Sequence, residues 1–261
     1  MTLGRLAYTK NGVLHILDIE SGGVTVIDDG SQQMHSPTWH PEGTFVAYAS
    51  SVIMAVRLED MRSRPVSPID QPAAFPVWHP SGRLMLYDIQ GTGIHLHSLE
   101  TDKIQFLPLG NLSIQAACHP DQQQIAFVGV IDGEKHICTV DLKCLDDQNC
   151  PTAVAQLTRA GRYNHAPSYS PDGTRIAFER FLEGGEHWAI MTMNTDGSDL
   201  QQITPAGVDA HHPTWGPGGN YLAFERVEKD VHSIHLIYAD GSGMRGLTSD
   251  GEREPAWWFE G

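Results

Sequence analysis

The chain has 261 residues, of which 40% are hydrophobic, so it can bury a substantial core. Its 17 Lys and Arg against 32 Asp and Glu give a formal net charge of −15. Such an acidic surface repels phosphate groups, which excludes nucleic acid as an expected partner. No run of about 18 or more apolar residues occurs, so we expect no insertion into a membrane.

The N-terminal stretch MTLGRLAYTKNGVLHIL lacks the charged segment and the purely apolar run that are typical of a signal peptide. The compartment therefore stays open between the cytoplasm and, if a signal has been removed, the periplasm. None of the four cysteines forms a CxxC pair, which disfavours a structural zinc site. Cys144 and Cys150 flank an acidic insertion, where they could form a small disulfide loop or stay free thiols.

Three short strands are predicted at the start of the chain, at residues 4–9, 13–19 and 24–28. A phrase made of one strand and a tight turn then recurs six times. The copies begin at Pro37, Pro76, Ala116, Pro167, Pro213 and Pro255. Their spacings of 39, 40, 51, 46 and 42 residues are typical of a solenoid, a propeller or an array.

The fourth copy contains the fullest unit. Its four strands, called a to d here, are predicted at residues 167–170, 175–179, 188–193 and 200–204. The turn Pro171-Asp172-Gly173 joins strands a and b, and its residue types favour a tight turn. Strand b alternates around Ile176 and Phe178, as expected of a half-buried strand. Four antiparallel strands per unit and no helical periodicity predict the blade of a propeller.

The two ends of the chain complete one another. One strand a remains at residues 255–259, and the three N-terminal strands match strands b, c and d. Together they form a sixth blade, which leaves no open sheet edge in the ring. We therefore expect an all-β, six-bladed propeller of four-stranded antiparallel blades, with residues 1–261 as a single domain, and a monomer.

The pattern PxWSPDGxxIAFxS resembles the repeat of the TolB-type propeller family, which is related to WD-repeat propellers. The residues that carry it are 167–173 with 176–178, 213–217 with 222–224, and Leu247-Thr248. The third copy departs from it, with Cys118 in place of the aromatic residue. The resemblance implies protein binding at the mouth of the central channel, and a few similar propellers are metal-dependent lyases of acidic polysaccharides. TolB also carries an α/β domain ahead of its propeller, for which we expect no room here.

The residues just ahead of each copy are the candidate site, because the repeat varies there. Two positions before each copy the chain has His35, Ala74, Ile114, His165, His211 and Arg253. We expect these residues in the loops between strands d and a, at one mouth of the channel. The residues predicted to bind a partner there are His35, His165, His211, His212, Arg253, Glu254 and Gln115.

Two further sets of residues are predicted at the same mouth. Three imidazoles in ring-equivalent positions, those of His35, His165 and His211, could hold a divalent metal such as zinc or manganese. The alternative is that they are ordinary solvated side chains, since the chain has 14 histidines. The loops between strands b and c are expected to add a charged rim of Arg180, Glu186 and Arg226.

Other recurring residues are interpreted as structural. Four tryptophans at one repeat position are expected to pack between blades: Trp39, Trp78, Trp215 and Trp257. Three histidines before the turn proline are expected to complete turn hydrogen bonds or to pack on neighbours: His40, His79 and His119.

Two functions follow from these observations. The preferred one is a non-enzymatic module that binds a protein or peptide at the channel mouth, because the blade count is complete and no nucleophile elbow, P-loop or HExxH motif occurs. The alternative is a metal-dependent carbohydrate-active enzyme, a lyase or hydrolase, built on the histidines at the mouth. No cofactor other than that divalent metal is indicated.

Overall fold

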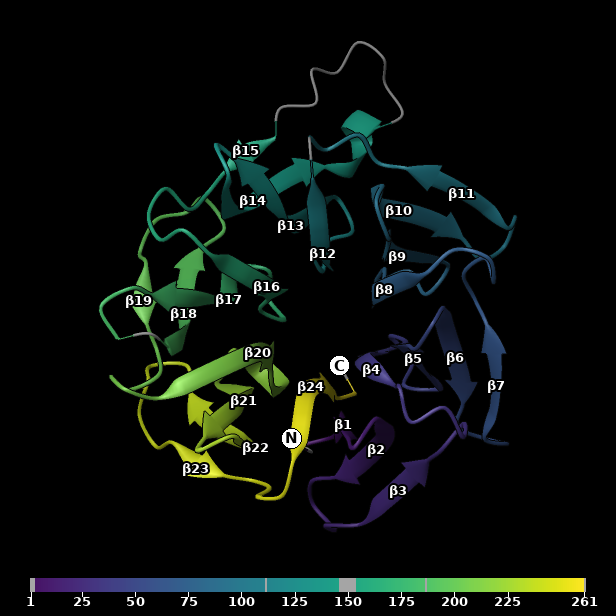
Figure 1. Ribbon diagram of the computed structural model, residues 1–261, viewed down its shortest axis with the longest axis horizontal. Helices are drawn as coiled ribbons and strands as arrows, with labels where there is room; N and C mark the ends of the chain where they lie inside the picture. Colours follow the sequence, from purple (N-terminus) through teal and green to yellow (C-terminus); the bar gives the residue numbers. More distant parts are fainter. Residues whose placement is uncertain (1–2, 111, 146–153, 186, 261) are drawn as a thin grey trace.

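A computed structural model describes residues 3–110, 112–145, 154–185 and 187–260 of the chain. Its strands form six four-stranded antiparallel sheets, which lie as blades in a ring around one axis (Figure 1). The described residues contain two short 3₁₀ segments, η1 (Leu142–Leu145) and η2 (Pro217–Gly219), and no α-helix. The predicted all-β, six-bladed propeller is confirmed.

Blades 1 to 5 each use four consecutive strands, with strand a at the axis and strand d at the outside. Blade 1 consists of β4 (His35–Trp39), β5 (Phe45–Ala49), β6 (Ile53–Arg57) and β7 (Arg62–Pro65). Blade 2 consists of β8 (Ala73–Trp78), β9 (Leu84–Ile89), β10 (Gly93–Ser98) and β11 (Lys103–Phe106). Blade 3 consists of β12 (Ser113–Cys118), β13 (Gln124–Ile131), β14 (Glu134–Asp141) and β15 (Ala155–Gln156).

The next two blades follow the same plan. Blade 4 consists of β16 (Asn164–Tyr169), β17 (Arg175–Leu182), β18 (His187–Asn194) and β19 (Gln201–Gln202). Blade 5 consists of β20 (Asp209–Trp215), β21 (Tyr221–Glu228), β22 (Val231–Tyr238) and β23 (Arg245–Gly246). Strand d of these two blades is only two residues long, shorter than predicted for the fourth copy.

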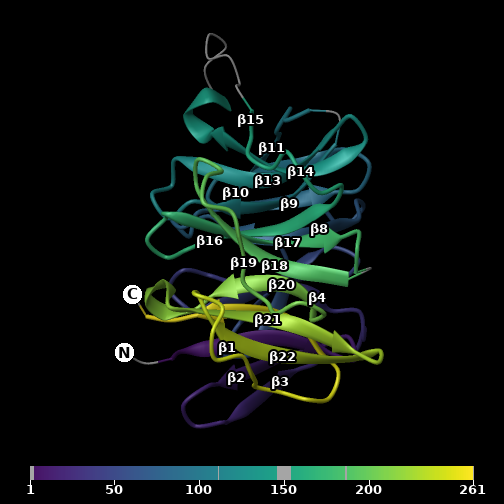
Figure 2. The same cartoon turned by 90° about the vertical axis from the view of Figure 1, so that its left-hand side faces the viewer.

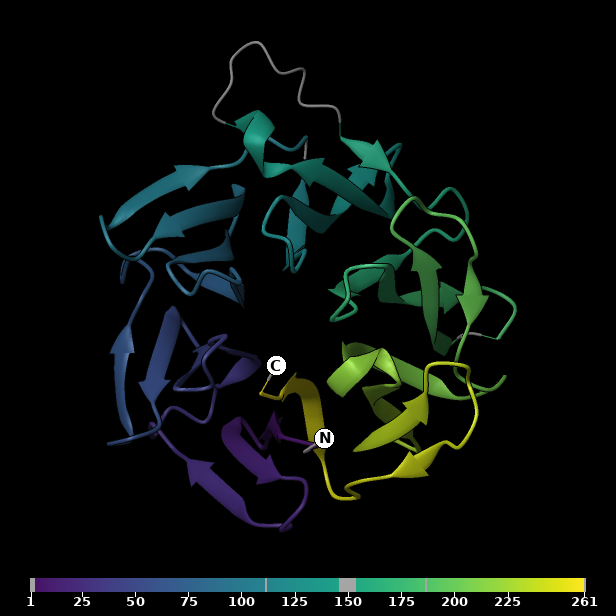
Figure 3. The same cartoon turned by 180° about the vertical axis from the view of Figure 1, so that it is seen from behind.

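The sixth blade closes the ring with both ends of the chain. Its strands are β24 (Glu252–Trp258), β1 (Arg5–Lys10), β2 (Val13–Asp18) and β3 (Val24–Ile27). β24 pairs antiparallel with β1, so that Leu6 faces Trp257 across the ladder. Seen from behind, the yellow C-terminal strand lies beside the purple N-terminal one (Figure 3), and both ends leave the ring on the same side (Figure 2). The predicted closure is confirmed.

The hydrophobic core is divided among the six junctions between neighbouring blades. Each of six buried clusters in the described residues contains side chains from two adjacent blades. In blade 4, Phe178 of strand b is fully buried against residues of blade 3. Burial of such an aromatic side chain contributes about 3 kcal/mol or more to stability. The ring is therefore held by interfaces that every blade shares with two neighbours.

The structural interpretation of the repeated aromatic and histidine residues is confirmed. The indole N–H of Trp39 donates to the carbonyl of Ala256 in the preceding blade at 3.0 Å. His119 contacts the carbonyl of Gly173 in the next blade through Nε2 at 2.9 Å, while Nδ1 accepts from the backbone N–H of Asp121. These residues serve the junctions between blades.

Strand a begins earlier than the sequence predicts, and this corrects the expected position of the site. β16 starts at Asn164, and a β-bulge interrupts its pairing between His165 and Ser168. The same bulge recurs in every blade, with φ between +48° and +54° at the residue before the repeat. These six bulge residues are Ser36, Phe75, Gln115, Ala166, His212 and Glu254. The candidate residues therefore lie in the innermost strands, and no loop separates them from the axis.

Candidate functional site at the channel mouth

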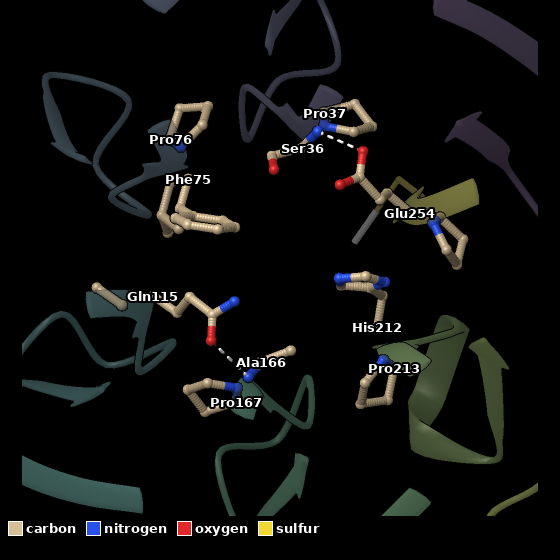
Figure 4. Close-up of a pocket in the computed structure, with 13 residues that line it drawn as sticks. Ser36, Pro37, Phe75, Pro76, Gln115, Ala166, Pro167, His212, Pro213 and Glu254 are labelled. Atoms are coloured by element: carbon tan, nitrogen blue, oxygen red, sulfur yellow. Dashed lines mark hydrogen bonds between the residues drawn. The ribbon is translucent and has the colours of Figure 1, made fainter. Parts of the chain in front are cut away.

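The six bulge residues and the prolines beside them surround a cavity of about 130 Å³ on the axis (Figure 4). Its wall is mostly apolar, with the prolines and the ring of Phe75, and the polar side chains of Gln115, His212 and Glu254 also line it. Since one water occupies about 30 Å³ in the liquid, the cavity has room for a few waters or for the end of one side chain. All six bulge residues have a positive φ, which strains the backbone of residues other than glycine. Such strain is concentrated at functional sites in proteins.

A side chain from the preceding blade accepts the backbone N–H of most bulge residues. Glu179 in β17 accepts the N–H of His212 at 2.8 Å, and Glu225 in β21 accepts that of Glu254 at 3.0 Å. Asp88 in β9 accepts the N–H of Gln115 in the same way at 3.0 Å. These three carboxylates occupy one equivalent position in strand b, opposite the residue before the bulge, and are buried.

Two bulge residues themselves take over this role where strand b has no acid. Glu254 accepts the N–H of Ser36 at 2.7 Å across the ring closure. Gln115 accepts the N–H of Ala166 at 3.1 Å through its amide oxygen, as Figure 4 shows. Glu254 and Gln115, both predicted as binding residues, therefore hold neighbouring blades together at the axis while they line the cavity.

Glu225 lies at the centre of a charged cluster between blades 5 and 6. Its two oxygens lie 3.2 Å from Nδ1 of His212 and 2.5 Å from Nδ1 of His232. Burial opposes charge on both partners, yet the hydrogen bond between them lowers the pKa of Glu225 to about 2 and, with the charges of Glu179 and Glu254, raises the pKa of His212 to about 9. The His212 ring therefore carries a positive charge into the channel at neutral pH.

The cluster reaches the surface through Arg253. Nη2 of Arg253 donates to Nε2 of His232 at 2.6 Å, which fits a His232 ring with its proton on Nδ1. Arg253 is exposed and lies in β24. A partner that contacts Arg253 would thus also contact a network that extends to the axis.

The three ring-equivalent histidines have three different surroundings. His211 lies 3.6 Å from Glu179 and 3.3 Å from Asp209; burial opposes its charged form, but the Glu179 carboxylate raises its pKa. His165 packs edge-on against Trp188, its Nε2 is buried without a hydrogen-bond partner, and burial lowers its pKa to about 4. Nδ1 of His35 contacts the hydroxyl of Ser36 at 3.2 Å.

No group of three or more His, Cys, Asp or Glu side chains in the described part of the chain is arranged to hold a metal ion. The metal site at His35, His165 and His211 stays a prediction. The Cys144–Cys150 pairing also stays one, because Cys150 and the side chain of Cys144 lie outside the described residues.

Two larger hollows open at the mouth on either side of His35, which lines both. The polar cleft, of about 630 Å³, lies between blades 5, 6 and 1 and includes Asp230, Asp250, Arg253 and Glu254. The apolar pocket, of about 430 Å³, lies between blades 1, 2 and 3 and includes Phe75, Ile89, Leu112 and Ile114. Both volumes fall in the range of ligand-binding sites in proteins.

The predicted charged rim is partly wrong. Arg180 is buried within β17, which continues to Leu182; its Nε donates to Asn164, so the guanidinium is not presented to the mouth. The strand was predicted to end at residue 179, and that error placed Arg180 in a loop. Arg226 is half-buried and paired with Glu228 at 2.9 Å. Glu186 lies outside the described residues.

Sequence reasoning missed the buried acids Asp88, Glu179 and Glu225. A signal was present, since each directly follows the buried aromatic residue of strand b, in LMLYD, RIAFE and YLAFE. An acidic residue that directly follows an apolar run within a strand is expected to be buried and to have a buried partner.

The fold and the channel define the class of protein: a closed six-bladed propeller with a bulged strand a in every blade. Residues 5–259 match the TolB beta propeller domain, and the chain belongs to that family. A comparison with curated protein sequences found no match. Within the described residues, no helix has the length and apolar character needed to cross a membrane.

Solved structures show the same fold. TolB from Acinetobacter baumannii is similar with a TM-score of 0.84 and 22% identity, covering 98% of this chain and 67% of that chain. A chain of a nidogen–laminin complex gives 0.75 and 9%, covering 97% of each chain. Oligogalacturonate lyase from Vibrio parahaemolyticus gives 0.60 and 12%, covering 94% of this chain and 74% of that chain. At these identities the likeness is one of fold alone.

Proposed function

We propose that this propeller is a protein-binding module that takes a peptide segment of its partner at the channel mouth. The observation that carries the proposal is the pair of hollows, one polar and one apolar, that meet at His35 around the channel opening. An extended peptide advances about 3.3 Å per residue with side chains on alternating sides, so one short segment can reach both hollows.

Membership in the TolB propeller family supports this proposal, as does the occurrence of the same fold in a nidogen–laminin complex. No specific observation favours the alternative, a metal-dependent carbohydrate lyase or hydrolase, because the lyase resemblance is limited to the fold. Elemental analysis of the purified protein distinguishes the two. The enzyme would be favoured if the wild-type protein contained zinc or manganese and the double variant His165→Ala, His211→Ala did not.

Selection from a random peptide library on the immobilised protein tests the binding proposal. Enriched peptides are labelled, and their affinity is measured by fluorescence anisotropy. We expect Arg253→Ala, at the mouth, to weaken binding about tenfold, as truncation of an interface arginine often does. Arg83→Ala is the matched control, since Arg83 is exposed beyond the turn between strands a and b of blade 2. Equal binding to both variants, or no enriched peptide, would refute the proposal.

A further inference from the structure

Three acids that occupy the same place in their blades differ in one respect. Asp88, Glu179 and Glu225 lie at the same position of strand b, and each accepts a bulge N–H of the next blade. Glu179 and Glu225 also have histidine partners, at 3.6 Å and 3.2 Å respectively. Asp88 has no ion pair among the described residues, and its Oδ1 is buried without a hydrogen-bond partner. The blade 2 acid is therefore the uncompensated member of the set.

The positions that supply the histidines elsewhere are uncharged around Asp88. His212, the bulge residue beside Glu225, corresponds to Phe75 in blade 2. His211, the partner of Glu179 from the next blade, corresponds to Ile114 in blade 3. Substituting an aromatic and an aliphatic side chain for two imidazoles leaves the carboxyl group in an apolar setting.

Asp88 is 6% exposed and forms part of the wall of the apolar pocket. The surrounding wall includes Phe75, Ile89, Leu112 and Ile114, and His35 is the other titratable side chain that lines it. Burial raises the pKa of Asp88 to about 7, although the N–H of Gln115 counteracts part of this shift. An ionised carboxylate in such a place is costly unless a cation or a donor reaches it.

We propose that the apolar pocket binds a lysine side chain of the peptide partner, with the alkyl stem along the pocket wall and the ammonium group at Asp88 Oδ1. This inference rests on the proposed peptide binding at the mouth. The net charge of −15 favours a basic partner segment. The bound ammonium takes the place that His211 and His212 fill beside Glu179 and Glu225.

The geometry of Asp88 selects lysine over arginine. Its Oδ2 already accepts the N–H of Gln115, so only Oδ1, which is buried, lacks a hydrogen-bond partner. A guanidinium binds carboxylates best as a fork that uses both oxygens, whereas an ammonium donates to a single point. The four-carbon stem of lysine is also the part that an apolar wall can cover.

The first test uses n-butylammonium as the probe, with n-butanol and n-butylguanidinium as analogues, and follows binding by NMR shifts of the pocket amides at pH 8. We expect n-butylammonium to bind best, because it alone combines the stem with a single-point cation. Asp88→Asn should weaken it about tenfold, the value of one charge-assisted hydrogen bond, while Asp102→Asn in the same blade should have no effect. Affinity should also fall below pH 7, since a proton competes for the same oxygen.

A second variant keeps the test independent of any loss of folding. Phe75→His places an imidazole at the backbone position that His212 occupies beside Glu225, with φ of +51° against +50°. We expect this variant to fold and to lose n-butylammonium binding, because the acid then has an internal partner. Equal binding of n-butanol, preference for n-butylguanidinium, or unchanged binding to Asp88→Asn would each overturn the lysine pocket.

The selected peptides separate this inference from the proposed function. If the peptides require the mouth residue Arg253 but tolerate replacement of each lysine by norleucine, peptide binding stands and the lysine pocket is wrong. If no peptide binds at the mouth while n-butylammonium still depends on Asp88, the proposed function is wrong and the pocket is an amine site unrelated to it. The third outcome supports both the proposed function and the lysine pocket. In it, replacing lysine weakens peptide binding about tenfold to the wild-type protein but leaves binding to Asp88→Asn unchanged.

Discussion

The carboxylate of Glu179 in blade 4 accepts the backbone N–H of His212 in blade 5 at 2.8 Å. A side chain of one blade thus holds the bulged backbone of the next at the channel axis. Because Glu225 and Asp88 repeat the contact, the residues that line the channel are also joints between blades. Substituting one of these acids should change both the stability of the protein and the lining of the channel. Whether the protein becomes more or less stable depends on the partner of that acid.

Glu225→Gln should destabilise the protein by about 2 kcal/mol at pH 7, since it leaves the charge of the half-buried His212 without the carboxylate that it contacts. The pKa of Glu225 lies near 2, below its ordinary value of 4.5, so its contribution is present above pH 4.5 and is lost as the pH falls through 2. Urea unfolding of both proteins from pH 7 down to pH 3 measures this. A difference that grows toward low pH would contradict it.

Asp88→Asn should have the opposite effect and stabilise the protein at pH 8. The pKa of Asp88 is raised from 3.8 to about 7, so the folded state binds the proton more tightly and stability falls as the pH rises from about 4 to 7. Removing the charge should recover up to about 4 kcal/mol above pH 7, at 1.36 kcal/mol per pKa unit, and almost nothing near pH 4. Thermal unfolding at both pH values tests this, with Asp70→Asn at an exposed position as the control, which should change stability by about 0.5 kcal/mol or less.

Ala166→Gly should stabilise the protein by about 0.5–1 kcal/mol, because Ala166 has φ of +48° and glycine adopts that conformation without strain. The matched control is Ala177→Gly in the adjacent strand β17, where the alanine is fully buried and the change should cost about 1 kcal/mol or more. Chemical denaturation of the two variants gives the comparison. Equal losses in both would mean that the bulge stores no strain.

Two neighbouring histidines should titrate far apart. Burial lowers the pKa of His165 to about 4, whereas Glu225, Glu179 and Glu254 overcome burial and raise that of His212 to about 9. Between pH 5 and 8 the His165 ring should therefore stay neutral and the His212 ring charged. NMR titration of the ring C–H signals, assigned with His165→Gln and His212→Gln, measures both values. A His165 midpoint near 6.5 would show that its ring is open to water.

Much of the fold could be predicted from the recurring residues. The turn prolines and glycines and the alternating strand b, as in Ile176 and Phe178, act over a few residues, so their effect is visible in a short window of sequence. The bulge in strand a was missed because Ser36, Gln115 and Ala166 share no side-chain property; only the backbone conformation repeats. Arg180 was misplaced because strand length depends on the pairing partner β18, which no local pattern of β17 specifies.

The sequence by itself determined the number of blades, the closure by the two ends of the chain and the set of residues that vary ahead of each copy. Which of those residues meet was decided by the tertiary structure. Glu254 reaches Ser36, 218 residues away, only because the ring closes. Asp88 lies among apolar side chains of blades 2 and 3, while Glu225 meets two histidines. The interaction of a buried charge depends on neighbours from other blades, and sequence separation carries no information about those distances.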